Sequence, residues 1–182
     1  MPTTEYKITT TEIPGLLIID IAAVSDDRGY FQEKYQKQKL TSLGFPESFV
    51  PVQQNISYNK QAGVLRGLHA EPWDKYVTVT KGKVFGAWVD LRKENFGKVV
   101  TAEIDEHKAV FVPQGVANAY QTLEPEVYYC YLVNDHWKPD GIYKSVNPGD
   151  PELQISWPIT FDQAIISEKD HKNALLKDIV PF

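Results

Sequence analysis

The chain has 182 residues, enough for one domain with a substantial core but too few for two ordinary domains, so we expect a single domain over residues 1–182. Hydrophobic residues make up 42% of the chain and charged residues 24%, a balance typical of globular proteins that fold without a partner. The net charge of −5 and the isoelectric point near 5.4 argue against nucleic-acid binding, which requires a basic surface.

Residues 1–15 contain no apolar run that would form a signal peptide, and no later segment approaches the ~20 apolar residues of a membrane span. These features predict a cytoplasmic protein without a membrane partner. Cys130 is the single cysteine, which excludes an intramolecular disulfide and a multi-cysteine metal site. Because Cys130 lies between aromatic residues in an apolar run, we expect a buried, unreactive thiol.

Short strands separated by turn residues follow one another along the chain, a pattern typical of all-β sandwiches and barrels. In chain order we expect them at residues 17–21, 50–58, 64–69, 76–80, 84–91, 99–104, 109–112, 117–123 and 127–133. About nine strands are enough to close a barrel. Helical signal is confined to residues 36–43 and to a turn or two within residues 171–176.

The strand at residues 76–80 shows the alternation most clearly. It places Val77 and Val79 on one face and Tyr76, Thr78 and Thr80 on the other. We expect the valine face to be core and the other face to meet solvent or a cavity.

His69 has the most informative surroundings of the four histidines, because the other three lie in segments typical of turns or surface, at His107, His136 and His171. It ends an apolar strand, follows Arg66 and Gly67, and precedes the loop that leads to Lys75. By itself, a lone histidine at a strand end is more often a hydrogen-bonded structural residue than a catalyst.

Arg66 and Gly67 together suggest an anion site, since a glycine lets the backbone approach a ligand that the guanidinium holds. Arg66 and His69 are three positions apart, so an ideal strand would point them to opposite faces. A bend at Gly67 is therefore needed for both to serve one pocket. Lys75 begins the next strand and could reach the same pocket across the hairpin, although a solvated lysine is the simpler interpretation.

Two further motifs are less specific. Residues 27–33 combine a turn glycine with Arg28, which suits a phosphate, and Phe31, on which a base could stack. Residues 112–118 contain a Pro-x-Gly turn between two strands, which indicates architecture.

Taken together, the motifs of the chain resemble, in order and spacing, those of dTDP-4-dehydrorhamnose 3,5-epimerases over residues 27–170. They are Asp27-x-Arg-Gly-x-Phe31-x-Glu33, Gln53-x-Asn55-x-Ser57, Leu65-Arg-Gly-Leu-His69, Val89-Asp-Leu-Arg92, Val112-Pro-x-Gly115, Tyr131 to Asp135, Asp150-Pro151, Trp157-Pro158 and Ser167-x-x-Asp170. The resemblance implies an all-β, cupin-type β-barrel (jelly roll) with short peripheral helices, in a homodimer. It also implies a cofactor-independent isomerase of dTDP-L-rhamnose biosynthesis, which inverts C3 and C5 of a dTDP-linked 4-keto-6-deoxyhexose.

The resemblance assigns four catalytic roles. His69 is the base that removes protons acidified by the neighbouring ketone, and Asp170 fixes its tautomer and raises its basicity. Lys75 faces the oxyanion that develops at O4. Tyr131 returns a proton from the opposite face, which turns abstraction into inversion.

The resemblance also assigns the binding residues, with Arg28 and Arg66 near the diphosphate. The others are Gln53 and Asn55 along the sugar nucleotide, Glu33 on its polar edge, and Phe31 and Trp137 beside the base. Three departures stand out. The loop from His69 to Lys75 is shorter than usual and looks like that of streptococcal members. Asn118 stands where the family usually has a histidine, so it can donate a hydrogen bond to the ligand but carries no charge. Trp137 stands where many members have a tyrosine.

Three alternatives remain. A metal-dependent cupin would need a His-x-His pair and a later histidine, but His69 is followed by Ala70 and Glu71 and the later position is Asn118, so we expect no metal. An epimerase acting at C3 or C5 alone, or a ketoisomerase of a related dTDP-sugar, would share the barrel and the base, and the sequence separates these poorly. A sugar-nucleotide-binding module without activity would promote no solvent exchange.

Overall fold

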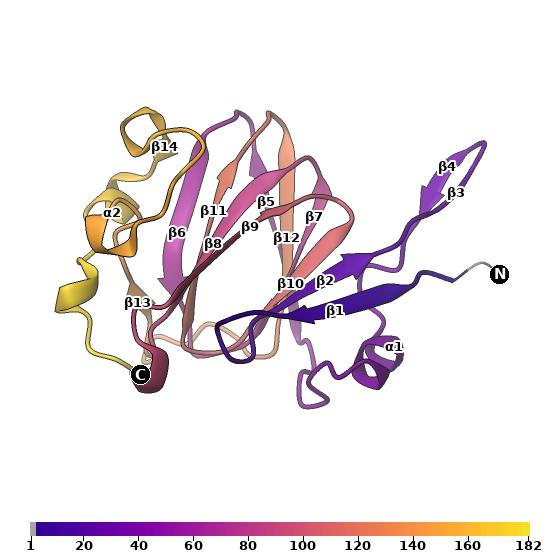
Figure 1. The fold of residues 1–182 in the computed structure, drawn as a ribbon, viewed down its shortest axis with the longest axis horizontal. Helices are drawn as coiled ribbons and strands as arrows, with labels where there is room; N and C mark the ends of the chain where they lie inside the picture. Colours follow the sequence, from indigo (N-terminus) through magenta and orange to yellow (C-terminus); the bar gives the residue numbers. More distant parts are fainter. Residues whose placement is uncertain (1–2) are drawn as a thin grey trace.

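The computed structural model describes residues 3–182, which form two six-stranded sheets that face each other, with short helices at the periphery (Figure 1). The first sheet has the order β1 (Tyr6–Thr10), β2 (Leu17–Ile21), β10 (Lys108–Val112), β7 (Lys75–Lys81), β12 (Val127–Val133) and β5 (Gln53–Asn59). The second has β13 (Lys144–Ser145), β6 (Val64–Ala70), β11 (Val116–Thr122), β8 (Val84–Asp90) and β9 (Val99–Ile104), with β14 (Ile165–Ile166) pairing with β6. Almost all of this pairing is antiparallel, which confirms the expected all-β jelly roll of the cupin type.

All nine expected strands are present, as β2 and β5 to β12. The sequence did not predict β1, the hairpin of β3 (Val24–Asp26) and β4 (Gly29–Phe31), or the short strands β13 and β14. β1 and the hairpin strands are mostly exposed, so they lack the apolar alternation by which a half-buried strand is identified. β13 and β14 have two residues each and are too short to show any alternation. The hairpin projects away from the barrel (Figure 1).

Helix α1 (Lys37–Ser42) confirms the helical signal at residues 36–43, because Gln36 caps its first turn with its side chain and Leu43 ends it. The second expected helix, at residues 171–176, is wrong in position. Helix α2 (Glu168–His171) starts earlier, since the Ser167 hydroxyl accepts a hydrogen bond from the Asp170 amide. The remaining helical turns are η1 (Lys93–Asn95), η2 (Pro151–Leu153), η3 (Phe161–Gln163) and η4 (Leu176–Asp178).

Hydrophobic packing divides the molecule into layers. Between the sheets, Val77 and Val79 pack with Trp88 and Tyr129, as expected for the valine face of β7. On the opposite face of β7, Tyr76 and Thr78 are buried, which corrects our expectation for these two residues, whereas Thr80 is exposed as expected. There Tyr76 is 1% exposed and packs under α1 and the segment after it, with Leu40, Phe45, Phe49 and Phe111. A distant segment therefore covers this face.

The chain after β12 packs on the outer face of the second sheet. Leu153, Trp157 and Leu176 contact residues of β6, β8 and β11, and this layer lies at the end of the barrel away from α1 (Figure 1). It thereby brings α2 beside β6. Cys130 is 3% exposed, which confirms the expected buried thiol. None of the helices formed by residues 3–182 combines the length and hydrophobicity needed to cross a membrane.

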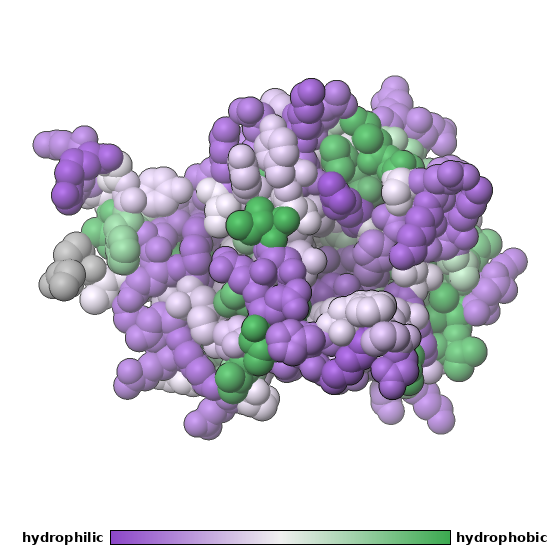
Figure 2. Space-filling view, turned by 180° about the vertical axis from the view of Figure 1, so that it is seen from behind, coloured by the Kyte–Doolittle hydropathy of each residue, from purple (hydrophilic) through white to green (hydrophobic). Residues whose placement is uncertain are grey.

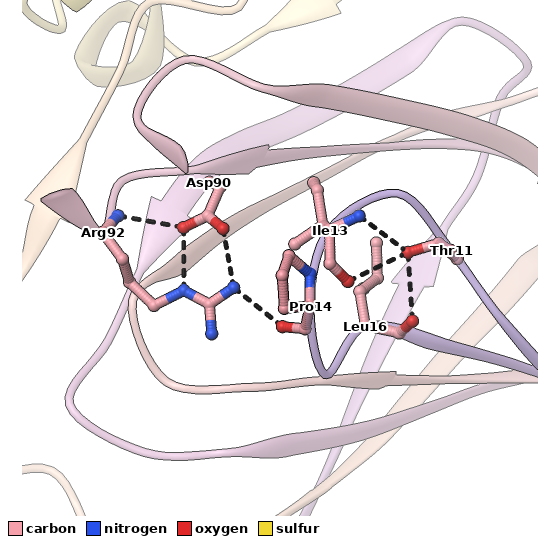
Figure 3. A network of polar contacts seen from close by, with 6 residues as sticks. All are labelled: Thr11, Ile13, Pro14, Leu16, Asp90 and Arg92. Atoms are coloured by element: carbon pink, nitrogen blue, oxygen red, sulfur yellow. Dashed lines mark hydrogen bonds and ion pairs between the residues drawn. The ribbon is translucent and has the colours of Figure 1, made fainter. Parts of the chain in front are cut away.

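A polar network joins the end of β8 to the turn between β1 and β2 (Figure 3). Asp90 is fully buried and accepts hydrogen bonds from Nε and Nη2 of Arg92, at 2.8 and 2.6 Å. Nη2 also donates to the carbonyl of Pro14 at 2.8 Å, and Thr11 closes the turn by donating to the carbonyl of Leu16 at 3.0 Å. The Val89-Asp-Leu-Arg92 motif thus fastens two parts of the barrel together.

Candidate active site

Strand β6 carries Arg66 and His69, and an irregularity lets both side chains face the space between the sheets. Arg66 pairs with Tyr120 and His69 with Asn118, so three steps along β6 oppose two along β11, as in a β-bulge. Gly67 adopts a φ of +120°, and a Cβ there would lie 2.5 Å from Ala119 Cβ. Only glycine fits this position. The expected bend at Gly67 is confirmed.

The bulge opens onto a cavity of about 440 Å³ between the two sheets, which we call the main cavity because it contains both His69 and Asp170. Its polar lining residues are Ser57, Arg66, His69, Glu71, Lys75, Asn118, Tyr120, Tyr129, Tyr131, Ser167 and Asp170. A second cavity, of about 450 Å³, shares His69, Glu71 and Tyr131 with the first, so the two form one continuous depression. The face of the molecule opposite to that of Figure 1 is hollowed near its middle between mostly hydrophilic residues (Figure 2).

His69 and Asp170 meet in the main cavity although they are 101 positions apart. Nε2 of His69 lies 2.7 Å from Oδ1 of Asp170, whose side chain is 8% exposed against 36% for His69. Burial alone would raise the pKa of Asp170, but the hydrogen bond and charge of His69, the Gly67 amide and the Ser167 hydroxyl together hold it below its usual value. The ionised carboxylate can only accept, so Nε2 carries the proton and Nδ1 is the nitrogen free to act as a base.

Lys75 and Tyr131 line the same cavity from β7 and β12. Both strands belong to the sheet that faces β6, so Lys75 reaches the cavity from the opposite sheet and not across the expected hairpin. Lys75 is 6% exposed and forms an ion pair with Glu71, which corrects the simpler interpretation of a solvated lysine. Its Nζ lies 5.9 Å from the centre of the Tyr131 ring. Burial and the charge of Glu71 raise the pKa of Tyr131, while Arg66 opposes them, so the phenol is protonated at neutral pH.

Asn118 is fixed by two neighbours. Its Oδ1 accepts hydrogen bonds from Trp88 Nε1 at 2.9 Å and from the Tyr129 hydroxyl at 3.1 Å. Because an indole nitrogen can only donate, the atom facing Trp88 is the oxygen, and the amide nitrogen is left to donate elsewhere. Asn118 lines the cavity, so this arrangement suits a ligand oxygen.

Arg66 is oriented by a buried amide. Its Nε donates to Oδ1 of Asn59 at 2.9 Å, and the Tyr120 hydroxyl donates to the same oxygen at 3.2 Å. Asn59 is 1% exposed and therefore holds the guanidinium group at the cavity wall.

The second cavity contains Gln53, Asn55 and Trp137. Nε2 of Gln53 donates to Oδ1 of Asn55 at 2.8 Å. Trp137 stacks on Tyr143 with ring centres 6.4 Å apart, and Trp73 meets the edge of the same ring at 5.7 Å. Aromatic surfaces beside amide groups suit a nucleoside.

Three predicted site residues lie outside both cavities of their own chain. Arg28 is 90% exposed on the β3–β4 hairpin and pairs with Asp26, and Phe31 is 59% exposed. Glu33 follows the hairpin and pairs with Lys39. The other nine predicted residues line one cavity or the other.

Several cavity residues were missed from the sequence, although strand alternation carried a signal for some. Ser57 lies two positions from Asn55, Tyr120 two from Asn118, and Tyr129 two from Tyr131, so each shares a face with a predicted residue. Glu71 lies in a loop, where no such period applies. Within residues 3–182, no group of three or more His, Cys, Asp or Glu side chains is arranged to hold a metal ion.

Comparison with known proteins gives consistent results. Residues 10–178 match the family model described as dTDP-4-dehydrorhamnose 3,5-epimerase. The chain is 51% identical over 178 residues to the protein named RmlC homolog of Streptococcus pyogenes serotype M6, which covers 94% of this chain and 89% of that protein. It is 33% identical to the dTDP-4-dehydrorhamnose 3,5-epimerase of Pseudomonas aeruginosa, over 94% of this chain and 97% of the relative.

Among solved structures, RmlC from Streptococcus suis in complex with dTDP-D-xylose superposes with a TM-score of 0.90 at 47% identity. The superposition covers 100% of this chain and 95% of that one.

Proposed function

The chain belongs to the dTDP-4-dehydrorhamnose 3,5-epimerase family, and we propose that His69 is the base that removes protons from C3 and C5 of a dTDP-linked 4-keto-6-deoxyhexose. The activity is that of an isomerase in the dTDP-rhamnose pathway. The observation that carries the proposal is the 2.7 Å contact between His69 and a buried, ionised Asp170, inside a cavity that also holds Lys75 and Tyr131.

The proposed reaction starts at a carbon next to the ketone. His69 takes the proton at Nδ1, and the electron pair of the broken C–H bond moves to O4 as an enolate. The Lys75 ammonium stabilises this charge in a site largely shielded from water. Tyr131 then donates its proton to the opposite face of the same carbon, which inverts the centre. Water takes the proton from the imidazolium and returns one to the phenolate, so the cycle balances.

Binding of the nucleotide is assigned to the remaining wall residues. Arg66, held by Asn59, and the free amide nitrogen of Asn118 supply donors for the diphosphate or the sugar hydroxyls. Gln53 and Asn55 lead from there to the aromatic surface of Trp137, on which the base stacks. One or two fixed cations suffice for a dianionic diphosphate in an otherwise acidic chain.

A homodimer is part of the proposal, because β5 is an edge strand of the first sheet and carries exposed apolar side chains. Ile56 is 62% exposed and Tyr58 is 46% exposed. Val50 and Val52, which precede β5, and Tyr128, which lies opposite Tyr58 on β12, are also exposed. An unpaired edge of this kind is normally covered. A second copy would also give Arg28, Phe31 and Glu33 a cavity to serve, since their own chain offers them none.

The dimer is tested by sedimentation of Ile56→Lys, which we expect to be monomeric at concentrations where the unchanged protein is dimeric. An unchanged dimer in this variant would mean that the interface lies elsewhere on the molecule.

A cytoplasmic location is also proposed, because an enzyme of nucleotide-sugar synthesis works where nucleotides are supplied. Fractionation of cells tests this location.

The function is tested by incubating the protein with dTDP-4-keto-6-deoxyglucose in heavy water and following C3 and C5 by NMR. We expect deuterium and inversion at both carbons. Exchange at one carbon alone would favour a single-site epimerase, and no exchange at all would indicate a binding module.

The same experiment on Tyr131→Phe separates the two faces of the reaction. Without the phenol proton, we expect inversion to fall roughly 100-fold and solvent exchange to fall much less. Equal loss of both would contradict the role of Tyr131.

A further inference from the structure

Glu71 brings a second carboxylate to the main cavity, in addition to that of Asp170. It follows β6 directly, in the loop that leads to Lys75, and its side chain is 20% exposed. The reaction outlined above gives Glu71 no role, although it lines both parts of the depression together with His69 and Tyr131.

The loop that carries Glu71 is anchored at its far end. Asp74 accepts a hydrogen bond from the Gln114 amide at 2.8 Å and another from Nδ2 of Asn134 at 3.0 Å. The Asp74 amide donates in turn to Oδ1 of Asn134 at 2.9 Å. These contacts tie the loop to the turn after β10 and to the end of β12, so Glu71 is held in place relative to the strands that carry Lys75 and Tyr131.

Glu71 and Lys75 neutralise each other. Oε2 of Glu71 is buried and, within residues 3–182, has no polar partner besides the Lys75 ammonium, which is itself almost fully buried. An unpaired ammonium at this depth would be strongly unfavourable. The pair leaves Nζ of Lys75 beside the face of the Tyr131 ring.

We propose that Glu71 is a positioning residue of the epimerisation: its carboxylate holds the Lys75 ammonium beside Tyr131 and offsets the charge that would otherwise draw the proton off the Tyr131 hydroxyl. This inference rests on the proposed function of Lys75 and Tyr131. A lysine close to a phenol favours the phenolate, and a phenolate has no proton to give to carbon. With Glu71 present, Lys75 is available to the enolate oxygen while Tyr131 remains an acid.

The groups around Tyr131 agree with this role. Burial is the largest cause that raises its pKa, the charge of Glu71 adds to it, and Arg66 acts in the opposite direction. The titratable or charged groups that share a cavity with Tyr131 are Arg66, His69, Glu71, Lys75, Tyr120, Tyr129, Asp135, Tyr143, Lys144, Lys169 and Asp170. Asp170 is committed to His69, which leaves Glu71 as the carboxylate of the main cavity that can balance Lys75.

The decisive variant is Glu71→Gln, which keeps the shape of the side chain and removes its charge. Because the lysine is less well held, we expect kcat for inversion to fall about tenfold with KM nearly unchanged. The alkaline limb of the inversion rate should move to lower pH, since Tyr131 loses its proton more readily. A loss expressed in KM alone would overturn the proposal.

A titration of tyrosinate absorbance tests the same point without any turnover. The contribution of Tyr131 is the difference between the protein and Tyr131→Phe, measured once with Glu71 and once with Glu71→Gln. We expect its midpoint at lower pH in the Glu71→Gln background, and an unchanged midpoint would overturn the inference even if the enzyme is active. If the unchanged enzyme promotes no solvent exchange, the proposed function fails, but this titration still decides the charge relation.

Two further variants complete the design. Glu71→Asp keeps the charge on a shorter side chain, so the midpoint of its Tyr131 titration should stay near that of the unchanged protein. Its kcat should lie between those of the unchanged protein and Glu71→Gln. If Glu71→Gln fails to fold, Glu71→Asp provides the test. A fall in its kcat with KM nearly unchanged would support the positioning role, and full activity would contradict it. Glu103→Gln, which removes an exposed carboxylate on β9, is the matched control and should leave both readouts unchanged.

Discussion

Two buried carboxylates, Asp170 and Asp90, are each paired with a basic side chain, but one pair lines a cavity and the other joins two parts of the barrel. Asp90 is fully buried and holds Arg92, which stays charged at any ordinary pH and fastens β8 to the turn between β1 and β2. Asp170 holds His69, whose partly exposed ring faces a cavity and can gain or lose a proton. A buried ion pair therefore indicates a reactive site only where one partner can titrate and has room for a ligand.

The largest expected effect comes from removing the titrating partner. We expect His69→Ala to lower the rate of deuterium exchange at both C3 and C5 by roughly 1000-fold or more, because the imidazole is the group proposed to take the proton at each carbon. NMR in heavy water measures both carbons at once. Exchange that survives at either carbon would mean that a second base acts there, and thermal unfolding close to that of the unchanged protein would show that the loss is chemical.

Removing the carboxylate of the same pair should have a smaller effect on the rate. In Asp170→Ala the imidazole loses the partner that fixes its tautomer and orientation, so we expect kcat to fall roughly 100-fold while substrate binding is nearly intact. Isothermal titration with a dTDP-sugar measures the binding. If this variant loses affinity for the dTDP-sugar but keeps its kcat, Asp170 contributes to binding and not to catalysis.

The sequence was informative where neighbouring residues determine the structure. Alternation in β7 identified Val77 and Val79 as core, and the three-residue spacing of Arg66 and His69 required the bend that Gly67 provides. It was uninformative where a distant segment decides. Tyr76 is buried because α1 and the segment after it cover it, and Asp170 reaches His69 because the final layer packs on the second sheet.

The same limit applies within the site. The orientation of Asn118 depends on Trp88 and Tyr129, which no local pattern links to it. The pairing of Glu71 with Lys75 depends on the chain crossing from β6 in the second sheet to β7 in the first, whereas the sequence suggested a hairpin and did not predict which side chains meet. Arg28, Phe31 and Glu33 line neither cavity of their own chain, so their binding roles stay a prediction.

Arg92→Ala tests the structural role of the Asp90–Arg92 pair. This change leaves the carboxylate of Asp90 buried without its counterion, so we expect the free energy of unfolding to fall by about 3 kcal/mol. Urea denaturation measures it, and kcat of the folded fraction should be unchanged. The double variant Asp90→Asn with Arg92→Met should lose less than Arg92→Ala, because no unpaired charge remains. A large change in the kcat of Arg92→Ala would instead mean that the Asp90–Arg92 pair affects the candidate active site.

The smallest effect concerns acid stability and is tested at Asp170. Its pKa is lower in the folded protein than in the unfolded chain, since the contacts of His69, Gly67 and Ser167 outweigh its burial. The stabilisation is therefore complete above the unfolded pKa of about 4, and it is lost as the pH falls through the lower folded value. Asp170→Asn lacks this contribution, so its free energy of unfolding should decline less between about pH 5 and pH 3. Denaturation curves at several pH values measure the difference, and parallel declines in the two proteins would mean that the carboxylate gains nothing from His69 on folding.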